Sequence, residues 1–470
     1  MGTIKKQKDN TKNLPVSFNL KKTKSNKIKK LSKNEILDVI IVGAGASGIS
    51  AGVHLQQHQK RVLILEARDR IGGRVHDTYV KGFGKIPLGA AWLHYKQNAW
   101  KNYHYSKHFL KELLDKHDVK YVKSEGLSNK DTFSLYNERG QLFKDKKMLK
   151  LLNDLPDLIC NECQKYPSKS ITSTIKKILS KYKLPSDIVG SFINRSLEHC
   201  SLNSDNISCK NYDCWKPNGD IVIDGYGKLL TKLSQDLKIK LNSEVVKIEQ
   251  TDLVTVTTKD GHQYRCRKLI STVPYGVLQS DRITFIPPLP SNKRRSLRTI
   301  NSSFHEKIFL SFPHKFWDPQ KDVFHYSHPK NRGLCSQWQS LPLKTNKHIL
   351  YTNLSGPAES YAYKSDDQLK KISMTVLKTI FGKNIPDPID IYVTKWKLDP
   401  FTKGAAYSYP KNNSSLKNMD IISQTFGNIH FAGVDTSSEI TETVEAAILS
   451  GVRVSREIME LDNLNGFLDK

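Results

Sequence analysis

The chain has 470 residues, of which 38% are hydrophobic, and its 74 basic and 46 acidic side chains give a formal net charge of +28. This length allows two or three domains with a sizeable core. No apolar run approaches the ~20 residues that span a bilayer, and neither end resembles a signal peptide or an anchor. We therefore expect a soluble intracellular protein, cytoplasmic or nuclear and not secreted.

Residues 1–34 form a basic tail with eleven lysines and one acid. Such a segment cannot bury enough apolar surface to fold alone, which predicts disorder. A second interpretation is a nonspecific electrostatic handle for an anionic partner, such as nucleic acid or an acidic surface. No aromatic pattern accompanies the lysines, so sequence-specific nucleic-acid recognition is not supported.

The next segments predict a βαβ unit. Residues 36–42, ILDVIIV, read as a buried strand because they are β-branched and end at a glycine. Residues 46–58 read as a helix and residues 61–67 as a second buried strand. The connection between the two strands is expected to be right-handed.

Further along, the character of the chain alternates. Residues 105–195 are lysine-rich with helical periodicity, whereas residues 221–273 return to buried strands around a short helix. Residues 304–312 alternate like a half-buried strand, and residues 368–382 form an amphipathic pattern. A buried strand at 427–434 and a closing helix at 444–460 follow. This order predicts two domains, each built from discontinuous pieces.

The glycines Gly43, Gly45 and Gly48 lie between the first strand and the first helix. In this context they predict a dinucleotide site, with a tight turn at Gly43, close approach to a pyrophosphate at Gly45 and close helix packing at Gly48. The helix N-terminus favours the phosphates. Glu66 ends the second strand, where a carboxylate accepts from ribose hydroxyls.

The continuation ARDRIGGRV, residues 67–75, adds a second glycine pair and the cations Arg68 and Arg74, which suit phosphate groups. Here the sequence resembles the flavin-dependent amine oxidase family, which includes monoamine and polyamine oxidases and the flavin histone-lysine demethylases. The resemblance extends over residues 36–460. It implies FAD, a two-lobed fold and oxidation of a C–N bond.

Further segments carry the same resemblance in the same order along the chain. They are LGAAWLHY (88–95), SLEHCSLNSDNIS (196–208), GYGKLL (225–230), STVPYGVLQ (271–279), HEKIFLSFPHKFW (305–317), WKLDPFTKGAAYSYP (396–410), FAGVDTS (431–437) and TVEAAILSGVR (443–453).

The resemblance implies a set of functional residues. Those near the flavin and the amine are His94, Glu198, Lys307, Trp396 and Tyr407. Those that bind the cofactor are Gly43, Gly45, Ala46, Ser47, Gly48, Glu66, Ala67, Arg68, Gly73, Arg74, Gly89, Ala90, Ala91, Trp92, Val245, Val246, Pro274, Gly433, Val434, Asp435, Thr443 and Val444. Structural roles are the alternatives: a hydrogen-bonded histidine, a surface lysine, core aromatics and an ion pair of Glu198 with Arg195.

The implied fold is a doubly wound α/β FAD-binding domain with a mixed substrate domain of β-sheet and helices. We expect FAD-binding segments at 35–115, 215–292 and 392–465. The substrate domain is expected at 116–214 and 293–391.

Three positions depart from the family pattern. Val434 stands where the family has a glutamate that touches the cofactor, with Asp435 one place later. Ala446 replaces a glycine, and Ile440 replaces an aromatic residue that helps to cage the substrate amine. FAD binding is therefore better supported than any particular amine.

The sequence predicts an FAD-dependent amine oxidase that uses O2 and releases H2O2, with a polyamine-like or N-alkyl-lysine-like substrate. One alternative is an L-amino-acid oxidase, which needs a pocket arginine for the substrate carboxylate. A second alternative is a catalytically weak, basic structural protein on the same fold.

The seven cysteines are an odd number, which argues against a closed disulfide framework. Cys160 and Cys163 form a CxxC, but the spacing to Cys200, Cys209 and Cys214 matches no standard zinc knuckle. We expect no metal and reduced, buried thiols.

Overall fold

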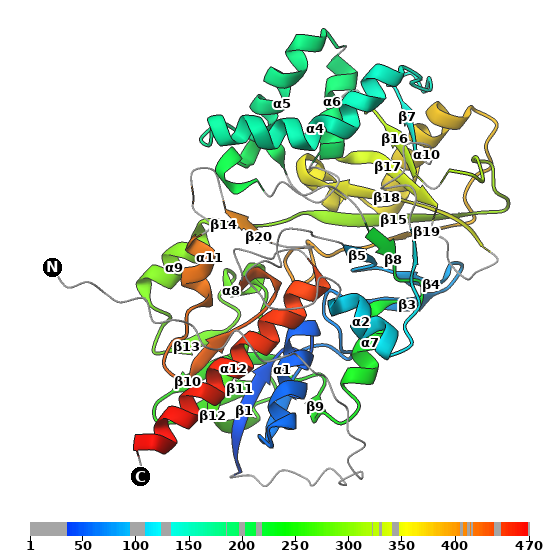
Figure 1. The fold of residues 1–470 in the computed structure, drawn as a ribbon. Coiled ribbons are helices and arrows are strands. Elements are labelled where there is room, and N and C mark those ends of the chain that lie inside the picture. The colour runs from blue at the N-terminus through cyan, green and yellow to red at the C-terminus, as the bar shows by residue number, and fades with distance from the viewer. Residues whose placement is uncertain are drawn as a thin grey trace.

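A computed structural model describes residues 35–94, 109–123, 133–184, 186–196, 203–212, 219–321, 323–328, 331–340, 347–404, 408–410, 414, 417–436 and 443–468. The basic tail, residues 1–34, lies outside them. Two large sheets organise the described chain, one in each half of the molecule in Figure 1. The structure is an α/β fold, as the sequence predicts.

The first sheet has eight strands in the order β13-β10-β11-β12-β1-β2-β9, with β21 paired to β12. Parallel pairing of β1 with β12 and with β2 forms its centre. The strands are β1 (Ile36–Val42), β2 (Val62–Leu65), β9 (Ile239–Lys240), β10 (Val245–Gln250), β11 (Val254–Thr258), β12 (Gln263–Ser271), β13 (Thr284–Ile286) and β21 (Ile429–Phe431). The predicted strands at 36–42 and 61–67 are confirmed as β1 and β2.

Helices α1 (Ala46–Gln57) and α12 (Val444–Leu468) lie side by side along this sheet (Figure 1). Ten of the twelve α1 residues are buried, since the sheet covers one side of α1 and α12 another. The Ser47 and Ser450 hydroxyls meet at 2.8 Å where the two helices contact each other. The first βαβ unit is therefore enclosed by the last helix of the chain.

The second sheet has six strands in the order β19-β15-β18-β17-β16-β7. They are β7 (Phe133–Tyr136), β15 (His305–Phe312), β16 (Val323–Tyr326), β17 (Leu334–Ser340), β18 (His348–Ser355) and β19 (Asp390–Val393). One face packs on α10 (Asp366–Phe381) through an apolar cluster that contains Ile308, Trp338 and Leu377. The opposite face carries Lys307, Tyr351 and Asn353, which line a cavity.

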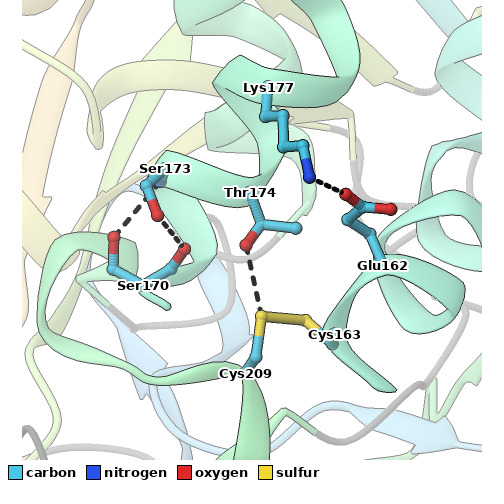
Figure 2. Close-up of a disulfide and its surroundings, with 7 residues drawn as sticks. All are labelled: Glu162, Cys163, Ser170, Ser173, Thr174, Lys177 and Cys209. Atoms are coloured by element: carbon cyan, nitrogen blue, oxygen red, sulfur yellow. Dashed lines mark hydrogen bonds and ion pairs between the residues drawn. A yellow bond between two sulfur atoms is a disulfide. The ribbon is translucent and has the colours of Figure 1, made fainter. Parts of the chain in front are cut away.

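Helices α4 (Lys146–Lys165), α5 (Ile171–Leu179) and α6 (Ser186–Ser196) pack together beyond this sheet, at the top of Figure 1. A disulfide joins Cys163 on α4 to Cys209, and the Thr174 hydroxyl lies 3.2 Å from the Cys209 sulfur (Figure 2). The expectation of reduced thiols is therefore wrong for this pair. An odd number of cysteines excludes only complete pairing and permits individual bridges.

Shorter elements connect the sheets. They are β3 (Asp77–Val80), β4 (Gly84–Pro87), β5 (Trp92–His94), α2 (Phe109–Lys116), β6 (Val122–Lys123), η2 (Ser180–Tyr182), η4 (Ser204–Asn206), η5 (Cys209–Asn211), β8 (Gly219–Ile221), α7 (Tyr226–Leu233), α8 (Tyr275–Leu278), α9 (Ser291–Arg298), β14 (Ile300–Ser302), η6 (Gly356–Tyr363), β20 (Ser408–Pro410), α11 (Lys417–Ser423) and η7 (Val434–Thr436). Within the described residues, no helix has the length and apolar character needed to cross a membrane.

Candidate active site

A cavity of about 360 Å³ is lined by residues from both sheets. At one end it meets the glycine turn after β1, and at the other it meets the polar face of β15, β17 and β18. Ligand sites in α/β proteins occur at the carboxyl ends of parallel strands, where β1 ends here. The cavity therefore combines a nucleotide-type end with a second end formed by the mixed sheet.

The glycine turn is shaped for close approach. Gly43 has φ +105°, and a Cβ there would overlap the Thr272 hydroxyl. A Cβ on Gly48 would overlap the Gly43 carbonyl, so Gly48 sets the distance between helix and turn. The N-terminus of α1 has no side-chain cap at Gly45. Its free N–H groups and its dipole thus provide an anion site at the cavity wall.

Glu66 lies at the end of β2 with 6% of its surface exposed. Its carboxylate accepts from the Ala44 N–H at 2.7 Å and from the Arg68 N–H at 2.9 Å. These bonds hold the carboxylate against the glycine turn, where it lines the cavity.

Arg68 and Arg74 line the cavity and are both held by carboxylates. Arg68 makes a two-pronged contact with Asp399, at 2.8 and 2.7 Å. Arg74 donates to Asp435 at 3.2 Å. Phe401 lies under two guanidinium groups, 5.2 Å from Arg68 and 5.5 Å from Arg282. Paired guanidinium groups remain cationic and fixed in orientation, as a phosphate site requires.

Lys307 lies on β15 with 7% of its surface exposed. Its ammonium donates to the Pro87 carbonyl at 3.0 Å and to the Gly89 carbonyl at 2.7 Å. Burial lowers the pKa of Lys307 to about 8, although the Asp77 carboxylate acts in the opposite direction. The side chain is thus a buried cation held in place in the cavity wall. The alternative interpretation from the sequence, a lysine on the protein surface, does not fit this burial.

The loop that follows β19 is fixed by Glu306, the neighbour of Lys307. The Glu306 carboxylate accepts from the Thr394 hydroxyl at 2.6 Å, the Trp396 N–H at 2.9 Å and the Lys397 N–H at 2.7 Å. Burial raises the pKa of Glu306, against these hydrogen bonds. The Trp396 indole donates to the Leu88 carbonyl at 3.1 Å. Trp396 and Lys307 are therefore anchored to the same stretch, residues 87–89.

The structure brings most of the predicted site residues together around this one cavity. In the lining are Gly43, Gly45, Ala46, Ser47, Glu66, Ala67, Arg68, Gly73, Arg74, Gly89, Ala90, Ala91, Trp92, His94, Val245, Pro274, Lys307, Trp396, Gly433, Val434, Thr443 and Val444. Gly48, Val246 and Asp435 do not line it: Gly48 packs on the turn, and Asp435 acts through Arg74. Tyr407 and Glu198 lie outside the described residues.

Several lining residues were not anticipated from the sequence. They are chiefly polar side chains of the six-stranded sheet, namely His305, Gln337, Gln339, Tyr351 and Asn353. The Tyr351 hydroxyl donates to the Gln339 amide oxygen, and the Lys307 ammonium lies 5.6 Å from the centre of the Tyr351 ring. Alternation along β17 and β18 was the available signal, since Gln337, Gln339, Tyr351 and Asn353 are spaced two apart within each strand.

Residues 46–459 match the family model described as flavin containing amine oxidoreductase. The chain belongs to the family of flavin-containing amine oxidoreductases. Lysine-specific histone demethylase 2 of Homo sapiens is 29% identical over 453 residues, covering 89% of this chain and 53% of the relative. Probable polyamine oxidase 4 of Arabidopsis thaliana is 27% identical over 436 residues, covering 89% and 86%. The oxidoreductase thus spans about half the length of the demethylase relatives.

Among solved structures, putrescine oxidase bound to putrescine is similar in fold, with a TM-score of 0.73 and 18% sequence identity. The match covers 91% of the oxidoreductase and 99% of that chain. It supports the two-lobed amine oxidase fold that the sequence predicts.

FAD is the cofactor of the oxidoreductase. The lining fits this group: an uncapped helix N-terminus, the fixed cations Arg68 and Arg74, and the Glu66 carboxylate placed for a ribose. A pyrophosphate needs close approach of the backbone and positive charge. The turn at Gly43 to Gly45 permits the close approach, and the N-terminus of α1 that follows it carries a partial positive charge.

The departure at Val434 has a structural counterpart. Val434 is buried in the lining, while the neighbouring Asp435, 3% exposed, holds Arg74. The carboxylate thus supports a cavity cation from behind. Ala446 is also buried, and Ile440 lies outside the described residues.

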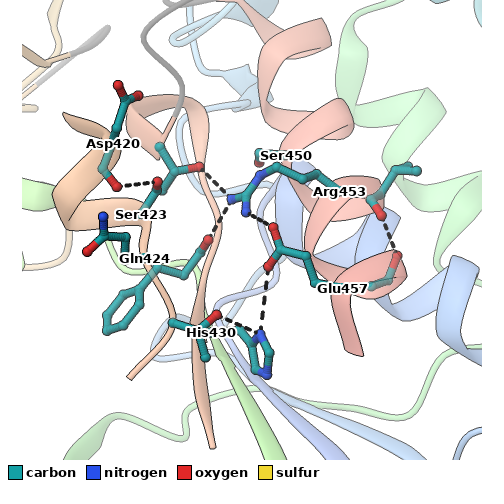
Figure 3. A network of polar contacts seen from close by, with 12 residues as sticks. Asp420, Ser423, Gln424, His430, Ser450, Arg453 and Glu457 are labelled. Atoms are coloured by element: carbon teal, nitrogen blue, oxygen red, sulfur yellow. Dashed lines mark hydrogen bonds and ion pairs between the residues drawn. The ribbon is translucent and has the colours of Figure 1, made fainter. Parts of the chain in front are cut away.

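Arg453 on α12 secures the chain around Val434. It donates to the Phe431 carbonyl at 2.7 Å and to the Thr436 hydroxyl at 3.3 Å, and it pairs with Glu457 (Figure 3). Glu457 also lies 3.7 Å from the ring nitrogen of the buried His430. The last cofactor segment is therefore held by side chains of the closing helix.

Proposed function

We propose that this oxidoreductase oxidises the C–N bond of an alkyl amine, polyamine-like or N-alkyl-lysine-like, with O2 as the final electron acceptor. Bound FAD supplies the hydride acceptor, and its reoxidation gives H2O2. The observation that supports this proposal most directly is the buried Lys307, held by two carbonyls in the wall between the glycine turn and the mixed sheet.

Lys307 would act as a fixed cation. With a pKa of about 8, its Nζ is protonated at neutral pH. A cation in a dry site stabilises negative charge that develops on oxygen, without a cost of reorganisation at the moment of reaction. The two carbonyl contacts keep Nζ in place, and a water bound to Nζ would be oriented by them.

The aromatic residues Trp92, Tyr351 and Trp396 would exclude water from the substrate. They line the cavity around Lys307, with Trp396 and Tyr351 buried. An apolar wall lowers the pKa of a bound amine, which favours the neutral form that gives up hydride readily. His94 on β5 lines the same region and would contribute a polar contact. The predicted roles of Tyr407 and Glu198 remain predictions.

The L-amino-acid oxidase alternative needs an arginine near the substrate. In the described lining the arginines are Arg68, Arg74 and Arg282, which belong to the region of the glycine turn and Phe401. The polar residues of the mixed sheet in the described lining are a lysine, a histidine, a tyrosine and neutral amides. This set favours an amine over an amino acid.

The test combines a spectrum with one substitution. Purified protein should show the absorbance of oxidised flavin, and anaerobic addition of a polyamine should bleach it. Lys307→Met should still be bleached but should be reoxidised by oxygen about 100-fold more slowly. Lys315→Met, an exposed lysine beyond the end of β15, is the matched control. Bleaching by amino acids alone, or unchanged reoxidation in Lys307→Met, would contradict the proposal.

A further inference from the structure

We propose that Asp77 is a positioning residue for the proposed oxidation, because its carboxylate is the counter-charge that keeps the Lys307 ammonium protonated. The inference rests on the proposed function, since it concerns how the cation that favours the oxygen step is maintained. Asp77 is the first residue of β3 and is not part of the described cavity lining. It therefore acts on the site through Lys307 and not by contact with a ligand.

Strand pairing brings the two charged side chains to the same hairpin. Asp77 on β3 pairs with Pro87 on β4, and the Cα atoms of residues paired in this way lie about 5 Å apart. The Lys307 ammonium donates to the carbonyl of the same Pro87, at 3.0 Å. The carboxylate and the ammonium therefore both lie next to Pro87, one on the hairpin and the other on the six-stranded sheet.

The turn before α7 fixes the Asp77 carboxylate. Its Oδ2 atom accepts from the Gly227 N–H at 2.7 Å. Gly225 has φ +78°, and a Cβ there would lie 2.4 Å from the Asp77 Cγ atom. The turn therefore has room for the carboxylate only because residue 225 is a glycine, which also adopts this positive φ without strain.

The second oxygen of the carboxylate depends on nearby positive charge. Asp77 Oδ1 is inaccessible and accepts no hydrogen bond from the described part of the chain. A buried carboxylate is unfavourable unless a cation compensates for it. Burial raises the pKa of Asp77, against the Gly227 hydrogen bond and the charges of Lys85 and Lys307. Lys85 is exposed and screened by solvent, whereas Lys307 is buried, so Lys307 is the more effective partner.

Lys307 in turn depends on Asp77. Burial favours its neutral amine, and among the described residues the Asp77 carboxylate is the charge that opposes this effect. Glu306 is adjacent on β15, but strand alternation directs it to the other face of the sheet, where it holds the loop after β19. The remaining ionisable side chains of the lining on β5, β15 and β18 are not anions at neutral pH; they are His94, His305 and Tyr351.

Asp77→Asn tests the inference, because asparagine has the same size and can still accept from the Gly227 N–H. The pH dependence of flavin reoxidation is measured in wild type, Asp77→Asn and Lys307→Met, and the transition that Lys307→Met lacks is assigned to Lys307. Loss of the carboxylate should lower the midpoint of that transition by about one pH unit. Reoxidation should then be about tenfold slower at pH values above both midpoints and unchanged well below them.

Asp224→Asn is the matched control. Asp224 also accepts a backbone N–H, that of Lys120, and directly precedes the same glycine turn. It is not among the charges that act on Lys307. A general disturbance of the turn would therefore affect Asp224→Asn as well, whereas loss of the counter-charge affects Asp77→Asn alone.

A double-mutant cycle on urea unfolding of the flavin-loaded protein adds a measurement that does not depend on turnover. A shift of one pH unit corresponds to about 1.36 kcal/mol, so Asp77→Asn and Lys307→Met should be coupled by about that amount at pH 6. Zero coupling, or a Lys307 transition with the same midpoint in Asp77→Asn, would overturn the inference. Wild-type reoxidation in Lys307→Met with full coupling in the cycle would refute the proposed oxygen step and sustain the pairing of Asp77 with Lys307.

Discussion

Glu445, in the first turn of α12, offers a quantitative test of how burial affects stability. The side chain is 5% exposed, and its carboxylate accepts one hydrogen bond, from the Leu110 N–H at 3.3 Å. Burial raises the pKa of Glu445 from 4.5 to about 8, and that single hydrogen bond acts in the opposite direction. The folded protein thus prefers the protonated carboxyl over a wide range of pH.

The sign and size of the effect follow from linkage. Between pH 4.5 and about 8 the folded state binds the proton more tightly than the unfolded chain, so the free energy of unfolding falls as pH rises. Between these two pKa values the free energy of unfolding falls by about 1.36 kcal/mol for each pH unit. From pH 4.5 to pH 8 the loss therefore amounts to about 5 kcal/mol. Glu445→Gln keeps an acceptor for Leu110 and cannot ionise. We expect it to be several kcal/mol more stable than wild type at pH 8 and similar to wild type at pH 5.

The measurement is urea unfolding followed by circular dichroism at pH 5, 6.5 and 8. The difference between variant and wild type cancels the other groups that titrate. Glu460→Gln, an exposed position on the same helix, should leave the pH dependence unchanged. If Glu445→Gln loses stability by the same amount at all three pH values, burial is not the reason for the raised pKa and the reasoning fails.

Three further predictions follow from the described contacts. Glu306→Gln weakens three charge-assisted bonds to residues 394–397, and we expect a loss of about 2 kcal/mol in unfolding free energy together with altered near-ultraviolet dichroism from Trp396. Lys293→Met should cost about 2 to 4 kcal/mol in thermal or urea unfolding, since the buried ammonium donates to three carbonyls at the end of α11; unchanged stability would contradict that role. Cys163→Ala should lower unfolding stability by about 2 to 4 kcal/mol in the oxidised protein and have little effect after reduction.

The nucleotide end of the site was predictable because its signals are local. A β-branched strand, three glycines and a helix follow one another within residues 36–58, and β1 and α1 form where that pattern places them. Glu66 and Arg68 come directly after the second strand of the same unit. The chemistry there depends on backbone geometry, which short sequence motifs specify.

The mixed sheet was less predictable for a physical reason. Along β17, the side chains of Gln337 and Gln339 are buried although they are polar, because they face a cavity and not the apolar core. The alternation of apolar and polar residues normally marks a solvated face, so the strand was not recognised. The role of Asp435 was also hard to predict from the sequence. Its carboxylate contacts Arg74, which is far away in the sequence, and does not line the cavity itself.

The central strand pair has a consequence for synthesis of the protein. Ile36 on β1 pairs with Arg265 on β12, and β12 in turn pairs with β21, which ends at Phe431. A nascent chain that has emerged from the ribosome up to the middle of its length therefore exposes one edge of the apolar strand β1, because β2 pairs with the other edge but β12 has not yet been made. Such intermediates aggregate readily. Production of this protein should consequently depend on chaperone supply and slow growth far more than its charged surface would suggest.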